Sequence, residues 1–443
     1  MRKSAAPAPG PRRAAARAAT LLLLLLCAAP AGAVDLRAAR FWTDPDHTRI
    51  VVDLSGPCAY RHDDLGAPPR IVIDVDEAAF TFDPDPIPVG DGLVKQIRFG
   101  PATQAGGTGR IVVDLEVPAR FDVFALEKVG DMPDRLVVDV KRPASVAPKP
   151  RVERRIGPDA VGDFLIMVDP GHGGEDTGRR NRDGLMEKSL ALDYARALKA
   201  EIDRRPGFRA ALTRDGDYFV PLGKRREIAE QKGAHLFVSV HFNAAPAADA
   251  RGTEIFFVSL KGADDRVTRE LEDAENSADL VGGLPPTDRD TGQDLARMLV
   301  DLRQSDCVDR SQQLAVDVND EIGKLGLVPT RRVKQAGFAV LKQLFIPAML
   351  MEVAFLSNRN DVKWVRVKGN RDAFVRAMAD GIVKYCEEVE VPRLGWRMHT
   401  VARGESLAQI AQTYRMSLDS LRAANGLNGD AVRPGQRLRV KQP

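Results

Sequence analysis

Short runs of β-forming residues, separated by glycine and proline, dominate the chain from Val34 to about Pro143. Several of these runs repeat one theme, in which an arginine precedes three β-forming residues and an aspartate follows them. The copies are Arg49–Asp53, Arg70–Asp74, Arg110–Asp114 and Arg135–Asp139, with a degenerate candidate at Val94–Phe99. The pattern predicts an all-β domain over residues 34–143, folded as an antiparallel sandwich or a barrel-like sheet.

Longer apolar runs alternate with helical patterns after Phe164. Continuous apolar segments indicate buried strands, and apolar residues at helical spacing lie between them. The strand segments are 164–168, 234–243 and 346–358, and the clearest helical patterns cover 187–202 and 220–232. This alternation predicts an α/β domain over residues 164–390, with a parallel or mixed sheet. Ligands of such sheets usually bind at the carboxyl ends of the strands.

The strands of this second region lead to residues that suit metal binding or acid–base chemistry. The first strand runs into a loop of proline and glycines that contains His172, and His241 lies where the second strand ends. Glu352 interrupts the third apolar run, and a buried unpaired carboxylate is costly unless something compensates its charge. Glu187 begins the helix after the glycine loop. His235, at the other end of the second strand, is expected to be structural.

Each of these residues also has an ordinary interpretation. A histidine in a turn can simply be satisfied by its neighbours, and a carboxylate at a helix N-terminus is favourable by itself. Taken together, however, two histidines and two glutamates make the set of a catalytic zinc site. Three ligands leave one position open, and the fourth group, outside the coordination shell, accepts a proton from water.

The same segments resemble the zinc N-acetylmuramoyl-L-alanine amidases of bacterial cell-wall turnover. The resemblance rests on the Asp169-Pro170-Gly171-His172-Gly173-Gly174 loop, the Glu187-Lys188 helix start, the segment 239–243 and the segment 352–358, which occur in the order of the family. It implies that His172, Glu187 and His241 bind zinc and that Glu352 is the general base. The activity it implies is cleavage of the amide between N-acetylmuramic acid and L-alanine of peptidoglycan.

A charged segment between Gly262 and Gly326 has no obvious role in holding zinc. Apolar residues at helical spacing predict two helices, 266–280 and 291–325, joined by a Gly-Gly-Leu-Pro-Pro break. A solvated helical insertion is one interpretation. The other follows from the resemblance, because amidases of the cell-division subgroup carry an autoinhibitory segment here that activator proteins displace. The acidic run 270–279 then supplies the blocking carboxylate, with Glu275 as the candidate.

The C-terminal residues 398–442 resemble a LysM module, which implies binding to the glycan of peptidoglycan. A strand at His399, a helix opened by Glu405 and Ser406, a second helix and a closing strand predict a small α+β unit. Residues 387–397 are expected to be a linker. The β domain, in turn, resembles the AMIN domain found before such amidases, which is associated with septal localisation and peptidoglycan binding. A sheet without any ligand is the alternative.

The N-terminal residues 1–33 have the pattern of a secretory signal peptide. Basic residues precede the apolar run Leu21–Leu26, and Ala31-Gly32-Ala33 offers a cleavage site before Val34. The apolar run is too short to span a membrane. The sequence therefore predicts export across the inner membrane to the periplasm or cell envelope, by the Sec or the Tat route. Residues 144–163, rich in proline, alanine and arginine, are expected to be a linker.

Charge and cysteine content narrow the range of possible functions further. The 65 basic and 62 acidic residues nearly balance, so nothing favours nucleic-acid binding. Three widely spaced cysteines after residue 33 make neither a disulfide framework nor a zinc ribbon. Two alternatives to the amidase remain: a zinc peptidase that cuts within the peptide stems, and a wall-binding protein without activity. The expected fold is thus multidomain, with an all-β domain, an α/β domain with a helical insertion, and a small α+β module.

Overall fold

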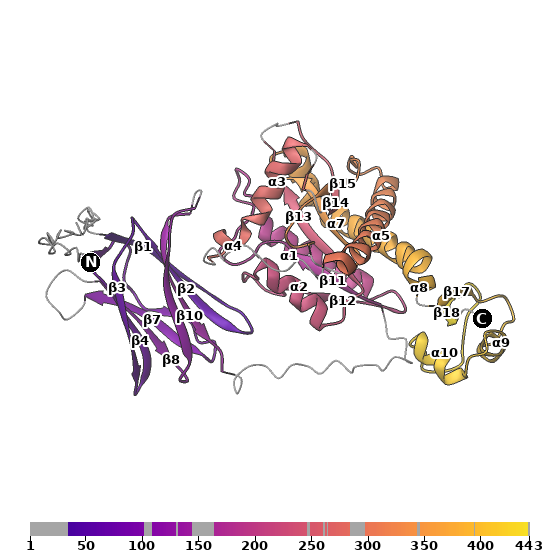
Figure 1. The fold of residues 1–443 in the computed structure, drawn as a ribbon, viewed down its shortest axis with the longest axis horizontal. Coiled ribbons are helices and arrows are strands. Elements are labelled where there is room, and N and C mark those ends of the chain that lie inside the picture. Colours follow the sequence, from indigo (N-terminus) through magenta and orange to yellow (C-terminus); the bar gives the residue numbers. More distant parts are fainter. Residues whose placement is uncertain are drawn as a thin grey trace, which may run out of the picture.

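A computed structural model describes residues 34–101, 109–129, 132–143, 164–245, 249–259, 262–263, 265–283, 297–342, 346–393 and 395–441, with the side chains of 297–305 and 393 left out. The expected signal peptide, the linker 144–163 and the Leu284–Pro286 part of the break lie outside these residues. Within them, the chain forms a β domain, a central α/β domain and a small C-terminal module (Figure 1).

The β domain is a sandwich of two five-stranded sheets. One sheet has the order β5-β1-β2-β10-β9, with β5 parallel to β1 and the other pairs antiparallel. The other has the antiparallel order β3-β4-β8-β7-β6. The strands are β1 Val34–Thr43, β2 His47–Leu54, β3 Tyr60–Gly66, β4 Pro69–Val75, β5 Ala78–Phe80, β6 Ile87–Pro88, β7 Val94–Pro101, β8 Gly109–Leu115, β9 Arg120–Leu126 and β10 Asp134–Lys141.

The repeated theme explains how the two sheets are built. Each sheet pairs two copies antiparallel, so that the arginine of one strand lies opposite the aspartate of the other. Arg135 is opposite Asp53 in the pair β2–β10, and Arg70 is opposite Asp114 in the pair β4–β8. The first and third of the three residues between them, such as Ile50 and Val52, belong to one buried core that both sheets share. The degenerate copy is strand β7, which pairs with β8.

The central domain has a mixed sheet in the order β12-β11-β13-β16-β14-β15. The first four of these strands are parallel, β14 is antiparallel to β16, and β15 is parallel to β14. The strands are β11 Phe164–Pro170, β12 Phe208–Leu212, β13 Leu236–Asn243, β14 Glu254–Val258, β15 Lys334–Ala336 and β16 Ala348–Phe355. Every residue of β11, β13 and β16 is buried, as their continuous apolar runs predict.

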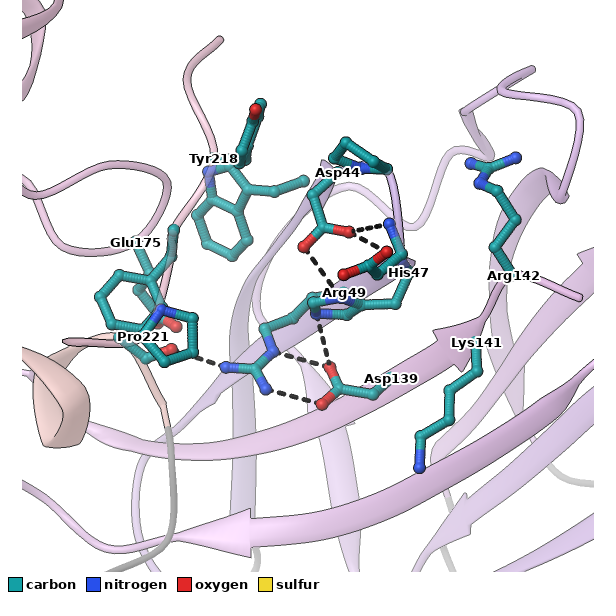
Figure 2. A pocket seen from close by; sticks show the side chains of 14 residues that line it. Asp44, His47, Arg49, Asp139, Lys141, Arg142, Glu175, Tyr218 and Pro221 are labelled. Atoms are coloured by element: carbon teal, nitrogen blue, oxygen red, sulfur yellow. Dashed lines mark hydrogen bonds and ion pairs between the residues drawn. The ribbon is translucent and has the colours of Figure 1, made fainter. Parts of the chain in front are cut away.

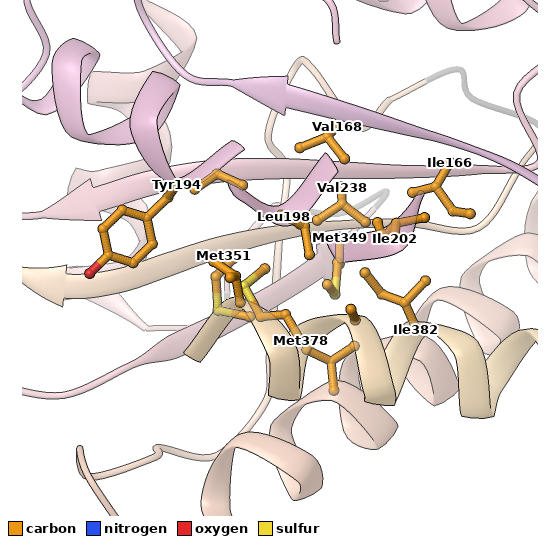
Figure 3. Close-up of a cluster of buried hydrophobic side chains, with 14 of the residues drawn as sticks. Ile166, Val168, Tyr194, Leu198, Ile202, Val238, Met349, Met351, Met378 and Ile382 are labelled. Carbon is orange, nitrogen blue, oxygen red and sulfur yellow. The ribbon is translucent and has the colours of Figure 1, made fainter. Parts of the chain in front are cut away.

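Helices cover both faces of this sheet. On one face α1 (Glu187–Ile202), α5 (Arg297–Lys324) and α7 (Lys368–Tyr385) contribute to the largest core, part of which Figure 3 shows between α7 and the strands. On the other face α2 (Leu222–Gln231) and α3 (Arg266–Asn276) pack on a second core through Ala229 and Leu271. The short α6 (Arg359–Val365) follows β16 and is capped by Asn358.

The segment expected as one insertion has two different parts. Leu314, Val318 and Ile322 of α5 belong to the main core, and Gly381 of α7 lets the two helices approach closely. The expectation that the whole of 262–326 is an added element is therefore corrected: α5 completes a layer of the fold. The first part also differs, because the helix expected over 266–280 breaks at Ser277 into α3 and a short α4 (Ala278–Val281).

The junction before the C-terminal module is helical rather than a linker. A π-helical turn, Cys386–Glu390, and α8 (Val391–Arg393) continue α7, which corrects the expectation for 387–397. The buried Glu390 stabilises this extension, since it accepts hydrogen bonds from the Tyr385 hydroxyl (2.5 Å) and Arg310 (2.9 Å).

The C-terminal module has the expected β-α-α-β order. Its elements are β17 Trp396–Thr400, α9 Leu407–Thr413, α10 Leu418–Ala424 and β18 Arg437–Lys441. Ser406 and Gln409 form a capping box at α9. His399 bonds to Glu405 (2.8 Å) inside the module, in agreement with a structural role. Arg439 contacts the Gly207 carbonyl and lies over the Phe208 ring, so the module touches the edge of the central sheet.

The structure also describes the cysteines after residue 33 and the length and apolar character of the helices. Cys58, Cys307 and Cys386 are present as thiols. Within the described ranges, no helix combines the length and the apolar character that a membrane span requires.

Candidate metal centre

The loop after β11 places His172 in an unusual backbone conformation. His172 has a φ of 59°, in the left-handed region that non-glycine residues seldom adopt. Such strain persists where surrounding structure enforces it, often at functional sites. Two glycines make room for the ligand side chains, because a Cβ on Gly171 would lie 2.4 Å from the His241 ring and one on Gly178 would lie 2.6 Å from both His172 and Glu187.

Two buried arginines hold this loop through hydrogen bonds to its backbone carbonyls. Arg225 donates to the carbonyls of Pro170 (2.6 Å) and His172 (2.8 Å), and Arg214 donates to the carbonyl of Gly171 (2.7 Å). Arg225 also pairs with the fully buried Asp169 at 2.9 Å. Burial by itself would raise the pKa of Asp169, but Arg225 and two hydroxyl donors outweigh it and keep the pKa below its ordinary value. The strained conformation is thus fixed by paired buried charges.

Four buried side chains converge above the loop. They are His172, Glu187, His241 and Glu275, and one candidate ligand atom from each lies within 4.8 Å of all the others. Glu187 Oε1 lies 3.0 Å from His172 Nε2 and 3.1 Å from His241 Nδ1. Glu275 Oε2 lies 3.3 Å and 3.1 Å from the same two nitrogens. The cluster therefore draws on the β11 loop, α1, β13 and α3.

Neighbouring groups fix the orientation of these side chains. Asp176 Oδ2 lies 2.7 Å from His172 Nδ1, on the side of the ring away from Glu187. Glu187 accepts hydrogen bonds from the backbone N–H groups of Phe242 (2.8 Å) and Arg179 (2.7 Å). A carboxylate behind a histidine and donors behind a carboxylate are the usual outer partners of metal ligands.

The charges of the cluster shift each other's pKa in a consistent way. Burial lowers the pKa of both histidines, yet the facing carboxylates outweigh it and raise the pKa of His172 well above its ordinary value and that of His241 to about 10. Burial would raise the pKa of Glu187 and Glu275, and the histidines lower both instead. Without a bound cation, the cluster therefore holds protons on its histidines.

Glu352 lies beside this cluster on the neighbouring strand β16, in register with His241 of β13. It is completely buried, and neither carboxylate oxygen has a hydrogen-bond partner among the described residues. Burial, reinforced by Glu187, Glu275 and Glu254, raises the pKa of Glu352 well above its ordinary value, although His241 opposes the shift. Glu352 is therefore a buried acid that holds its proton more tightly than an exposed glutamate does, which makes it a candidate for proton transfer.

The donor set fits a divalent cation such as zinc. His172 Nε2 and Glu275 Oε2 are buried without a well-aligned hydrogen bond in the described part of the chain, although each has partners about 3 Å away. Atoms that converge at such distances without hydrogen-bond geometry are typical of ligands around a shared ion. Histidine nitrogen and carboxylate oxygen are ordinary zinc ligands.

The helix α3 covers the cluster. Asp265 caps its N-terminus, Leu271 packs in the core below, and Glu275 reaches the two histidines. Asn276 fastens the end of the helix, since it bonds to the Gly337 carbonyl and the Ala339 N–H. The cavity left beside His172 and His241 measures about 10 Å³, which is no more than one water needs. A substrate cannot reach the cluster in this arrangement.

The structure brings together all the site residues that the sequence singles out. His172, Glu187 and His241 form the cluster, Glu352 adjoins it, and Glu275 faces it from α3. His235 lies apart, where its ring accepts a hydrogen bond from the Leu165 N–H (3.1 Å).

Other residues of the site were not foreseen. They are Asp169, Asp176, Arg214 and Arg225, and each is buried. An aspartate at the end of a continuous apolar run, as in Val168-Asp169, was a signal of a buried charge that needs a partner. The arginines gave no such signal, because their partners are backbone carbonyls distant in the sequence.

Fold and site together define a multidomain α/β protein with a buried histidine–glutamate centre at the ends of its parallel strands. A family model described as N-acetylmuramoyl-L-alanine amidase matches residues 166–384, an AMIN domain model matches 38–140, and a LysM domain model matches 399–441. The chain is 33% identical over 383 residues to the N-acetylmuramoyl-L-alanine amidase AmiC of Neisseria meningitidis serogroup B, which covers 80% of this chain and 90% of that protein.

Two further proteins match the chain, one in the search by sequence and one among solved structures. The N-acetylmuramoyl-L-alanine amidase AmiC of Escherichia coli O6:H1 is 29% identical over 379 residues, which covers 79% of this chain and 88% of that protein. Among solved structures, the amidase AmiC2 of Nostoc punctiforme matches with 27% identity and a TM-score of 0.38, over 51% of this chain and 97% of that one. The chain belongs to the N-acetylmuramoyl-L-alanine amidases and is a hydrolase of peptidoglycan with AMIN and LysM domains.

Proposed function

We propose that His172, Glu187 and His241 bind a zinc ion and that Glu352 is the general base of the amidase reaction. The observation that carries the proposal is the convergence of the three ligand side chains from separate elements, with Glu352 on the adjacent strand. When bound, zinc would supply Lewis-acid chemistry, because it would polarise the scissile carbonyl and lower the pKa of water enough to provide a nucleophilic hydroxide.

The residues of the chain supply orientation and proton transfer. Asp176 holds the ring of His172 through Nδ1, which leaves Nε2 as the ligand atom. Glu352 takes the proton of the attacking water at its carboxylate and returns it to the nitrogen of the departing L-alanine. Burial favours this role, since the raised pKa of Glu352 makes it a better proton acceptor than an exposed glutamate.

We propose further that α3 is an autoinhibitory helix and that Glu275 takes the fourth position at the metal. Its carboxylate lies as close to the two histidines as that of Glu187 does, and the helix leaves almost no cavity beside them. Activation therefore requires a movement of α3–α4, for which an activator protein is the expected partner.

The setting of the enzyme is proposed as the periplasm, where it acts in cell-wall remodelling and daughter-cell separation. Export would depend on the N-terminal signal. Peptidoglycan contacts made by the LysM module and the β domain would raise the local concentration of the catalytic domain on an insoluble polymer, since several weak contacts on one chain give avidity.

The test is mass spectrometry of peptidoglycan digested by three zinc-loaded, full-length proteins: the wild type, Glu275→Ala and His172→Ala. We expect the Glu275→Ala variant to release stems that begin with free L-alanine at least about tenfold faster than the wild type, because the blocking carboxylate is gone. The His172→Ala variant should bind no zinc and release nothing.

Each part of the proposal can fail separately. Fragments cut within the peptide stem would contradict cleavage at the amide between N-acetylmuramic acid and L-alanine. Equal rates for the wild type and Glu275→Ala would contradict a blocking role of Glu275. Full activity of His172→Ala would contradict the ligand set.

A further inference from the structure

The arginines of the repeated theme have different surroundings in the two sheets of the β domain. Arg110 in β8 pairs with Asp74 at 2.6 Å, and its side chain remains 28% exposed. Arg49 in β2 and Arg135 in β10 occupy the equivalent positions of the other sheet, yet their side chains are only 8% and 0% exposed. The two arginines are buried because this sheet faces the central domain, beside α4 in Figure 1.

Arg49 and Arg135 bind the C-terminal end of the α3–α4 segment, whose first helix covers the metal cluster. Arg135 donates to the carbonyls of Val281 (2.9 Å) and Leu280 (3.4 Å). Arg49 donates to the carbonyls of Gly282 (2.6 Å) and Gly283 (3.2 Å) while it keeps its pair with Asp139. Cations are favourable at this position, because the last carbonyls of a helical segment have no partner within the helix.

The same arginines reach the loop that carries His172. Glu175, which is almost completely buried, pairs with Arg135 at 3.2 Å and with Arg40 of β1. Arg40 in turn pairs with Asp53, the aspartate of the first repeat copy. One strand pair of the β domain therefore binds both the end of α4 and the metal-site loop, and Arg135 connects the two.

The contact leaves little space for other groups around α4. A Cβ on Gly282 would lie 2.3 Å from the Phe219 ring, and a Cβ on Gly283 would lie 3.1 Å from Arg49. Asp279 at the same time accepts a hydrogen bond from the Leu222 N–H (2.8 Å). The segment is thus held on one side by the central domain and on the other by arginines of the β domain.

A cavity of about 480 Å³ opens at this junction, as Figure 2 shows around Arg49, Glu175 and Tyr218. Its walls come from both domains, with Asp44, His47 and Lys141 on one side and Tyr218, Phe219 and Pro221 on the other. The junction therefore depends on a few charged and polar contacts next to an open space, so the domains can separate without exposing a large apolar core.

We infer that the β domain holds the autoinhibitory segment, residues 266–283, in its inhibitory position. We call this contact the latch. Arg49 and Arg135 hold the carbonyls of residues 280–283, and this contact keeps α3 and Glu275 over the metal centre. When the β domain is drawn away, the end of α4 loses its cations, and the helix that carries Glu275 becomes free to leave. The inference rests on the proposed blocking role of Glu275 and adds the part of the chain that regulates it.

The test compares hydrogen exchange of residues 266–281 in the full-length, zinc-loaded protein and its Arg135→Ala variant. We expect exchange in this segment to become at least about tenfold faster, and the release of peptide stems to rise toward the rate of Glu275→Ala. The matched control is Arg110→Ala, which removes the corresponding arginine from the other sheet and should change neither quantity.

Arg49→Ala serves as a second variant if Arg135→Ala does not fold, because Arg49 donates to the carbonyls of Gly282 and Gly283 in the same segment. Unchanged exchange of residues 266–281 in a folded variant would overturn the latch, as would the same increase in Arg110→Ala. Faster exchange together with an inactive Glu275→Ala would instead support the latch and contradict the blocking role of Glu275. The two proposals are therefore tested separately.

Discussion

Two buried clusters of charge include residues of the loop after β11, and their compositions differ. In one of them His172 joins Glu187, His241 and Glu275, and His172 Nε2 and Glu275 Oε2 are buried there without a well-aligned hydrogen bond among the described residues. In the other, Glu175, three residues along, meets the guanidinium groups of Arg40 and Arg135. The second cluster pairs its carboxylate with guanidinium groups, whereas the first pairs its carboxylates with histidines, which can release their protons when a metal ion binds. The comparison separates a ligand site from a contact between domains.

We expect the largest loss of activity from Glu352→Gln, a substitution next to the first cluster. The amide has nearly the same shape as the carboxylate but cannot accept the proton of water, so we expect activity to fall by about 10²–10⁴-fold. The measurement is stem release in a Glu275→Ala background, with bound zinc determined in the same samples. Zinc content should stay at the wild-type level, and a loss as large as in His172→Ala would show that Glu352 is a ligand.

A smaller change is expected from Asp176→Asn, which removes the carboxylate behind His172. Loss of such an outer partner typically weakens metal binding by about 10–100-fold. Competition with a zinc chelator measures this affinity, and Asp183→Asn, on the exposed part of the same segment, is the control. An unchanged affinity would mean that the Asp176 contact only stabilises the loop.

Zinc binding and stability at the first cluster should both depend on pH. In the zinc-free protein the pKa of His172 and of His241 is raised, so zinc must displace protons, and its affinity should rise with pH between about 6 and 8, by about tenfold per unit for each proton released. The histidines stabilise the zinc-free fold fully below their unfolded pKa of about 6.5, and this contribution is lost as pH rises toward 10, the pKa of His241.

Zinc titrations and denaturant unfolding at several pH values measure these opposite trends. A zinc affinity that does not depend on pH would contradict protonated histidines in the zinc-free cluster.

The smallest effect on zinc is expected from Glu175→Gln in the second cluster. Glu175 faces the arginines rather than the histidines, so we expect zinc affinity to stay within about twofold of the wild type, although Glu175 is close to His172 in sequence. Exchange of residues 266–281 should nevertheless become faster, as with Arg135→Ala. A loss of zinc comparable to that of Asp176→Asn would show that the two clusters are coupled through the loop.

Much of the site was predictable because local sequence and burial agree there. A lone acid such as Glu352 in an apolar strand needs a compensating group, and parallel strands bring their carboxyl ends to one edge. Glu187 begins α1 as its position before the apolar period indicates. The arrangement of α5 was less predictable, because a helix with one apolar face looks alike whether it decorates a domain or completes its core.

The sequence by itself determined the three kinds of domain, the strands that supply the ligand side chains, and the acidic run that contains Glu275. Periodicity and the cost of buried charge are local properties, which the order of residues fixes. Only the tertiary structure decided which carboxylate faces the histidines, that Arg214 and Arg225 hold the loop, and that two of the repeat arginines bind α4 rather than water. These contacts join residues that are distant in the chain, and a side chain's partner there depends on how the domains pack.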